Sequence, residues 1–251
     1  MSFRNVYADD VRASSYAQLE FANTYHLAFR DLPAIIGKHV TGARAVDFGC
    51  GAGRSTRFLR GLGFETIGVD TAPEMIARAR ALDPGGDYRE IPDDDLSGLE
   101  RGACDLVTSL FTFDNIPGFD LKLRILRDLL GLLKPGGRLV NVVSSPEIYL
   151  HESASFSTRD FLAQNREARF GDEVRIVTTE FPDSRPCVDI LCSDETYREL
   201  YARAGADVLT VHRPLATGDE PYRWISETEI APWVIYVLGK ENAEAGIDGI
   251  A

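Results

Sequence analysis

Hydrophobic and polar positions along residues 44–143 follow a regular order of short apolar runs and longer amphipathic segments. The apolar runs predict buried strands, and the segments with a helical period predict helices between them. The predicted strands are 44–48, 65–69, 88–91, 105–110 and 138–143, and the predicted helices are 55–61, 72–82 and 121–133. Because strands alternate with helices, we expect an α/β fold with a doubly wound parallel sheet and helices on both faces.

The segments on either side of this core predict a cover for it. The expected parts of the single domain are an N-terminal helical lid at 1–39, the core at 40–143, an insertion at 144–192, a last helix and strands at 193–240, and a loose tail at 241–251. Within them we expect a helix at 16–30, an antiparallel hairpin from 173–181 and 186–192, a helix at 193–204, and strands at 207–211 and 232–238.

Composition narrows the class of protein. The chain has 251 residues, of which 44% are hydrophobic and 26% charged, as is typical of one globular domain. Its net charge of −12 argues against a nucleic-acid or anionic-membrane partner, for which basic patches are expected. We see no signal peptide and no membrane span. The four cysteines lack metal or disulfide spacing, so we expect reduced thiols in a cytoplasmic protein without a metal.

The most informative motif joins the first predicted strand to the first predicted helix. Residues 45–55 read Ala-Val-Asp-Phe-Gly-Cys-Gly-Ala-Gly-Arg-Ser, with glycine at positions 49, 51 and 53. Glycine permits a positive φ and lets the backbone approach a ligand, and the N–H groups of the following helix favour an anionic group. The spacing lacks the last glycine of the dinucleotide fingerprint G-x-G-x-x-G.

Four segments, taken in order, resemble the class I S-adenosylmethionine-dependent methyltransferases. They are this glycine motif, Asp70 at the end of the second strand, the Asp-Leu-Ser-Gly-Leu segment at 95–99, and the Lys-Pro-Gly-Gly turn at 134–137. The resemblance covers 40–143 and the C-terminal strands. It implies a mostly parallel sheet of seven strands, with S-adenosyl-L-methionine as the cofactor.

The resemblance also implies roles for individual residues. Asp70 corresponds to the acid that holds both ribose hydroxyls, and a carboxylate suits a diol because it can accept two hydrogen bonds. Asp95 corresponds to the acid that accepts from the adenine amino group. By position, Tyr25 or Arg30 is expected to hold the methionine carboxylate, although Arg30 could be an ordinary surface arginine. The other expected cofactor contacts are Asp47, Gly49, Cys50, Gly51, Ser55, Thr71, Met75, Leu96 and Leu110.

Four of the acidic positions also have a structural interpretation. Asp47 could orient the loop or the cofactor's ammonium group, or it could cap the turn. Asp70 could be the N-cap of the next helix, a role that Thr71 could fill instead. The acids at 93–94 could belong to a solvated loop, and Asp95 has the better register for adenine.

Methyl transfer chiefly requires that the nucleophile, the methyl group and the sulfur lie in line. A base is needed only for a protonated nucleophile, and His151 is the candidate by location, with a packing or capping role as the alternative. The candidate substrate-pocket residues are Phe113, Asn115, Tyr149 and Trp224, of which Phe113 also suits the core. No Asn/Asp-Pro-Pro-Tyr element follows the fourth strand, which argues against nucleic-acid bases and protein glutamine as acceptors.

We therefore expect a methyltransferase that acts on an O, N or C atom of a small molecule, as a monomer or homodimer. Two alternatives remain open. One is a cofactor-binding protein with a role other than methyl transfer. The other is an NAD(P)-dependent oxidoreductase, which the glycine spacing and the Lys-Pro-Gly-Gly turn disfavour.

Overall fold

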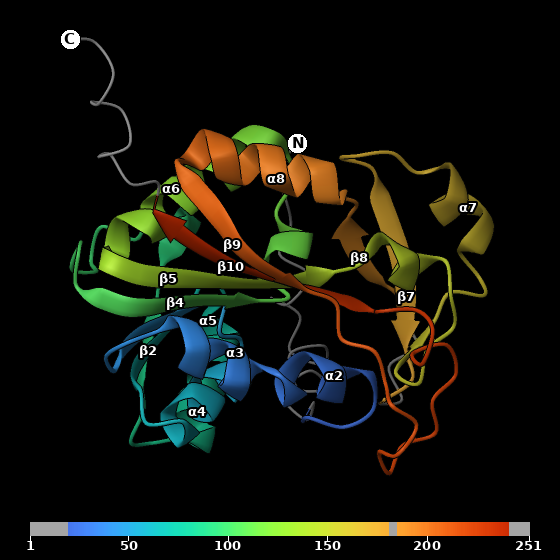
Figure 1. Cartoon of the computed structure of the whole chain (residues 1–251), viewed down its shortest axis with the longest axis horizontal. Coiled ribbons are helices and arrows are strands. Elements are labelled where there is room, and N and C mark those ends of the chain that lie inside the picture. The colour runs from blue at the N-terminus through green and yellow to red at the C-terminus, as the bar shows by residue number, and fades with distance from the viewer. Residues whose placement is uncertain (1–19, 181–184, 241–251) are drawn as a thin grey trace, which may run out of the picture.

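The structure, a computed structural model, describes residues 20–180 and 185–240, and a seven-stranded sheet runs through its middle (Figure 1). The strands are β1 (Arg44–Phe48), β2 (Glu65–Asp70), β3 (Asp87–Glu90), β4 (Cys104–Leu110), β5 (Leu133–Ser144), β9 (Ala206–His212) and β10 (Trp233–Lys240). Their order is β3-β2-β1-β4-β5-β10-β9. The pairs from β3 to β5 are parallel, and β10 is antiparallel to both β5 and β9. The expected mostly parallel sheet of seven strands is confirmed.

Helices cover both faces of this sheet. They are α2 (Thr24–Arg30), α3 (Leu32–His39), α4 (Arg54–Gly61), α5 (Pro73–Leu82), α6 (Phe119–Leu132), α7 (Leu162–Glu167) and α8 (Asp194–Ala204). In Figure 1, α6 and α8 lie above the sheet, and α2, α3 and α4 lie below it. Because successive side chains of a strand point to opposite faces, Val107 packs with the α6 and α8 cluster and Leu106 with the α2 and α3 cluster. All residues of β4 are buried, as expected for a central strand covered on both faces.

The N-terminal segment differs from the single helix expected at 16–30. Residues 16–19 lie outside the described residues, residues 20–23 are not helical, and α2 begins only at Thr24 and ends at Arg30 as predicted. Asp31 separates α2 from a second short helix, α3. Pro33 stands in the first turn of α3, where its missing N–H breaks no helical hydrogen bond. The chain therefore turns at Asp31 and continues as a second helix.

The insertion after β5 contains the antiparallel pairing that the sequence predicts. Strands β6 (Phe156–Ser157), β7 (Glu173–Thr178) and β8 (Cys187–Ile190) form a small sheet in the order β6-β7-β8. Figure 1 shows this sheet beside α7, at the end of the main sheet toward which β5 points. Phe181 of the predicted hairpin and the predicted tail at 241–251 lie outside the described residues.

Two smaller features complete the fold. The predicted turn at 134–137 lies inside β5, which follows α6 directly, and Gly136 there has a φ of +80°. The cysteines at 50, 104, 187 and 192 are all buried. Among the residues that the structure describes, none of the helices is long and apolar enough to cross a membrane.

Candidate cofactor site

The glycine loop lies at the carboxyl end of β1, where ligands bind in open parallel sheets. Gly49, Gly51 and Gly53 have φ values of +71°, +53° and +82°, a region that favours glycine. A Cβ on Gly49 would lie 2.1 Å from the hydroxyl oxygen of Thr112, and one on Gly53 would lie 2.7 Å from the Tyr88 ring. A Cβ on Gly51 would meet nothing within 4 Å. The loop is therefore packed at its two ends and open in its middle.

Asp47 lies beneath this loop and has no exposed surface. Its Oδ2 accepts hydrogen bonds from the hydroxyls of Ser55 (2.5 Å) and Thr56 (2.7 Å), and its Oδ1 accepts one from Thr108 (2.8 Å). Burial raises the pKa of the Asp47 carboxyl, and the three hydroxyl bonds oppose this. Asp47 thus connects β1 to β4 and to the first turn of α4, which fixes the loop. The Ser55 hydroxyl serves this connection.

Asp70 ends β2 and holds the glycine loop from the other side. Its Oδ2 accepts the N–H of Gly51 (2.8 Å), and its Oδ1 accepts the N–H of Ala72 before α5 (2.9 Å). Burial raises its pKa, and these backbone hydrogen bonds oppose the rise. The N-cap of α5 is Ala72 and α5 has no side-chain cap hydrogen bond, so the alternative that Asp70 or Thr71 caps this helix is wrong. Each carboxylate oxygen offers about two acceptor positions, so the same group can also accept hydroxyl protons from a ligand.

In the acidic loop after β3, Asp94 rather than Asp95 lies near Asp70. Asp93 and Asp94, in the 3-10 helix η2 (Pro92–Asp94), have φ values of +54° and +58°. Asp95 is exposed, and its Oδ1 accepts the Ser97 N–H at 2.9 Å. The charge of Asp94 is close enough to Asp70 to raise the pKa of that carboxyl. The role of Asp95 toward adenine therefore stays a prediction, with Asp94 as a second candidate.

The remaining predicted cofactor contacts lie around this edge of the sheet. Leu110 ends β4, and the next residue, Phe111, has a φ of +64°, which is uncommon and strained for a bulky side chain. Cys50 is buried within the loop, and burial raises the pKa of its thiol. The other three predicted contacts are Thr71 just before α5, Met75 buried in its first turn, and Leu96 buried in the core.

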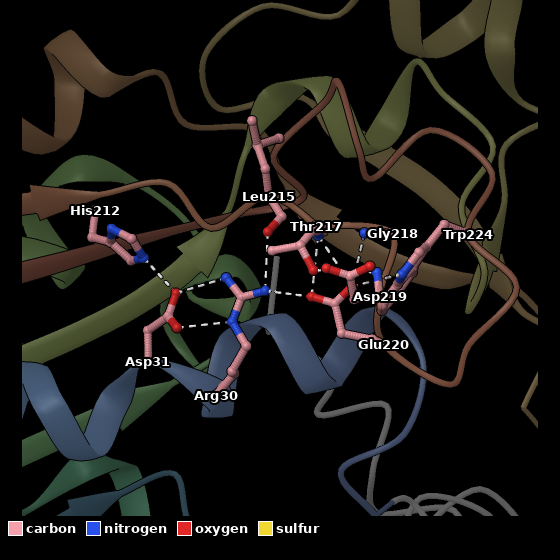
Figure 2. Close-up of polar contacts among 9 residues, drawn as sticks. All are labelled: Arg30, Asp31, His212, Leu215, Thr217, Gly218, Asp219, Glu220 and Trp224. Atoms are coloured by element: carbon pink, nitrogen blue, oxygen red, sulfur yellow. Dashed lines mark hydrogen bonds and ion pairs between the residues drawn. The ribbon is translucent and has the colours of Figure 1, made fainter.

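Tyr25 and Arg30 of α2 point to different neighbours. Tyr25 is buried, and its ring contacts Phe111, Phe156 and Trp233 with centroid separations of 5.6, 5.5 and 5.6 Å. Arg30 faces the loop that follows β9 (Figure 2). It donates to both oxygens of Asp31, at 2.8 and 2.9 Å, and to the Oε1 of Glu220 at 2.7 Å (Figure 2).

The predicted acceptor-side residues do not form one cluster. Their places are as follows: Phe113 is fully buried in the α6–α8 core, Asn115 donates to the Phe111 carbonyl, Tyr149 is buried and donates to Asp189, and Trp224 donates to Glu220. His151 is about two-fifths exposed, and its Nε2 lies 3.3 Å from an oxygen of Glu147. Among the residues that the structure describes, His151 has no hydrogen bond to the glycine loop or to the end of β4.

Glu227 is a buried residue to which the sequence analysis assigned no role. Its Oε1 accepts from the hydroxyl of Thr24 (2.6 Å) and the N–H of Ala154 (2.7 Å). Its Oε2 accepts from the N–H groups of Ile225 (3.0 Å) and Ser226 (3.1 Å). One carboxylate therefore joins α2, the segment before β6 and the loop before β10. No local pattern marks such a residue, because its partners are far away in the sequence.

The core of this site matches a known family. Residues 46–141 match the family described as a methyltransferase domain, and this stretch contains the glycine loop, Asp70, the acidic loop and the Lys-Pro-Gly-Gly segment. This part of the chain is therefore similar to the class I S-adenosylmethionine-dependent methyltransferases.

Individual relatives agree with this class. A ubiquinone biosynthesis O-methyltransferase from Xanthomonas euvesicatoria pv. vesicatoria (strain 85-10) is 36% identical over 104 residues, which are 40% of this chain and 42% of that protein. The match thus spans about two fifths of the length of this curated relative. Two solved structures show the same fold. The CcbJ methyltransferase from Streptomyces caelestis has a TM-score of 0.65 at 16% identity, covering 94% of this chain and 98% of its own. An S-adenosylmethionine-dependent methyltransferase from Mesorhizobium loti has a TM-score of 0.58 at 22% identity, covering 83% of this chain and 96% of its own.

The residues at the carboxyl edge fit this cofactor. The open middle of the glycine loop admits a ligand against the backbone at Gly51. Two backbone hydrogen bonds fix the direction of the Asp70 carboxylate, and its remaining acceptor positions suit a diol such as that of a ribose.

Proposed function

We propose that the protein transfers a methyl group from S-adenosylmethionine to an oxygen, nitrogen or carbon atom of a small molecule. The observation that carries this proposal is the fixed pair of glycine loop and Asp70 at the open edge of the sheet, with a cover built from three separate segments above it. We place the reaction in the cytoplasm, in a monomer or homodimer.

The cofactor, when bound, supplies an activated methyl group on a sulfonium, which is a good leaving group. The chain then has to bind it, orient it and align the nucleophile. In this proposal, Asp70 accepts from the ribose hydroxyls, and Asp94 or Asp95 accepts from the adenine amino group. Asp47 acts indirectly, because its hydrogen bonds fix α4 and therefore the glycine loop.

On the acceptor side, an aromatic cluster supports a planar, largely apolar substrate. Phe111 at the end of β4 lies 4.6 Å from Trp233 and 5.6 Å from Tyr25, measured between ring centroids. Phe156 of β6 extends the cluster into the small sheet. Aromatic walls bind flat apolar rings through edge and face contacts. Because the matched curated relative is named an O-methyltransferase, a hydroxyl on such a ring is the acceptor that we favour.

His151 is our candidate for the general base if the acceptor arrives protonated. It follows the 3-10 helix η4 (Pro146–Tyr149), beyond the carboxyl end of β5, and Glu147 lies beside it. A carboxylate next to an imidazole can orient the ring, which is the arrangement of a base held by a second group.

Calorimetry and a labelled-methyl assay test the proposal in two steps. We expect S-adenosylhomocysteine to bind with micromolar affinity and NAD(H) not to bind. The reverse result would identify an oxidoreductase instead. Incubation with labelled S-adenosylmethionine and small-molecule fractions should then label a metabolite. Binding of the cofactor without labelling of any fraction would favour a role other than methyl transfer.

A further inference from the structure

The carboxylate of the cofactor's methionine part needs a cation, and Arg30 of α2 was the first candidate. Figure 2 shows why Arg30 suits another task. Its Nε and Nη2 bind Asp31, and its Nη1 binds both Glu220 and the Leu215 carbonyl (3.1 Å). The hydrogen bond with Asp31 raises the pKa of the Arg30 guanidinium. Two carboxylates already neutralise the positive charge of this guanidinium, so it attracts the carboxylate of a ligand only weakly.

Glu220 shows what this arginine does instead. Its carboxylate also accepts the N–H groups of Thr217 and Gly218 and the indole N–H of Trp224. Arg30 therefore fastens the loop after β9 to α2 (Figure 2).

Arg54 lies in a different place, directly after Gly53 at the first position of α4. Its guanidinium carbon lies 4.6 Å from the ring centroid of Tyr25, 5.3 Å from that of Phe29 and 5.6 Å from that of Phe111. A guanidinium packed on ring faces keeps its N–H groups at its edge, in its own plane, and these are the groups that bind a carboxylate bidentately. One of them donates to the Glu20 carbonyl at 2.8 Å.

The charges around the loop favour the same place for a carboxylate. Asp47 and Asp70 lie under and beside the loop, so its inner side favours the cofactor's ammonium group. Positive charge lies at the start of α4, from Arg54 and from the helix N-terminus. Arg57, one turn later, donates to the Ala52 carbonyl and so holds the loop itself.

We propose that Arg54, held over the rings of Tyr25, Phe29 and Phe111, binds the methionine carboxylate of the cofactor. Tyr25 is then a positioning residue, which acts through Arg54. This inference rests on the proposed function, because it assigns a residue to the cofactor of that reaction.

Two ligands separate the carboxylate from the rest of the cofactor. S-adenosylhomocysteine carries the amino-acid part, and methylthioadenosine contains the same nucleoside without it. By calorimetry, we expect Arg54→Met to weaken S-adenosylhomocysteine binding by about 10- to 100-fold, the range for a lost charge-assisted bidentate contact. Methylthioadenosine binding should change by less than about 2-fold, because its contacts remain.

Matched variants complete the test. Arg54→Lys keeps the charge but not the planar fork, so it should recover part of the S-adenosylhomocysteine affinity. Arg30→Met should leave that affinity within about 3-fold of the wild type, because Arg30 binds the loop after β9. Tyr25→Leu should weaken S-adenosylhomocysteine selectively, which a merely structural role would not do.

Three results would overturn the inference. The first is an unchanged affinity of Arg54→Met for S-adenosylhomocysteine. The second is an equal loss of affinity for S-adenosylhomocysteine and methylthioadenosine in both Arg54→Met and Arg54→Lys. The third is a selective loss of affinity for S-adenosylhomocysteine in Arg30→Met. A wild-type protein that binds neither ligand would instead refute the proposed function, and with it this assignment.

Discussion

Replacement of Glu227 by glutamine should destabilise the cover over the site. The carboxylate has no exposed surface and accepts four hydrogen bonds, from Thr24, Ala154, Ile225 and Ser226. Glutamine keeps one oxygen and replaces the other by an NH₂ group, which cannot accept. The cheaper orientation turns the NH₂ toward Thr24, whose hydroxyl can rotate and accept. The N–H of Ala154 then loses its partner.

The magnitude follows from these contacts. One buried N–H without a partner costs about 1–3 kcal/mol, and the bonds to the remaining oxygen weaken because the acceptor is now neutral. The neutral amide is less costly to bury than a carboxylate, which offsets part of the loss. We expect Glu227→Gln to lower the free energy of unfolding by about 2 kcal/mol. For a chain of this size, that shifts the melting temperature by about 4–8 °C.

Urea unfolding followed by tryptophan fluorescence measures this effect at the right place. The two tryptophans of the chain are Trp224, in the same loop as Glu227, and Trp233, whose indole N–H donates to the Thr24 carbonyl at 2.8 Å. Glu229→Gln is the matched control, because Glu229 is an exposed glutamate of the same loop. If Glu227→Gln unfolds within about 0.5 kcal/mol of that control, the carboxylate does not hold the cover together.

Four further outcomes follow from the same structure. Asp70→Asn should weaken S-adenosylhomocysteine binding by about 1–3 kcal/mol in calorimetry, and an unchanged affinity would remove Asp70 from the site. Asp94→Asn should weaken binding more than Asp95→Asn does, and the reverse order would restore the assignment made from sequence. His151→Ala should lower turnover on the order of 100-fold and leave cofactor affinity unchanged, whereas full turnover at every pH would exclude a base at this position. Glu220 is partly desolvated, which raises its pKa, but the N–H of Thr217 and its other partners lower the value to about 2. Its folded-state pKa thus lies below the unfolded value, so its stabilising effect is full above about pH 4.5 and disappears toward pH 2. The stability deficit of Glu220→Gln should therefore shrink as pH falls through that window in acid unfolding, and a constant deficit would contradict a stabilising role for the charge of Glu220.

The order of the core elements could be predicted from the sequence because the causes are local. The strands predicted at 44–48, 65–69 and 105–110 agree with β1, β2 and β4 to within one residue, since buried parallel strands are short apolar runs bounded by turns. Positive φ values at Gly49, Gly51 and Gly53 likewise follow from alternate glycines between a strand and a helix.

The N-terminal segment shows where local reasoning failed. Apolar and aromatic residues from 16 to Arg30 suggested one helix, but of its described part only Thr24–Arg30 is helical and residues 20–23 are not. Hydrophobic periodicity reports which residues are buried, and it does not report where a short helix begins.

The sequence by itself determined the sheet, the glycine loop and Asp70, and with them the class of cofactor. Each of these depends on residues close together in the chain, whose spacing fixes the local backbone. Only the tertiary structure decided which charged groups meet: Arg30 with Glu220, Asp94 beside Asp70, and Glu227 with Thr24, 203 residues away. Many acids and bases in a chain of this charge could pair, and the closure of the three covering segments selects the pairs that form.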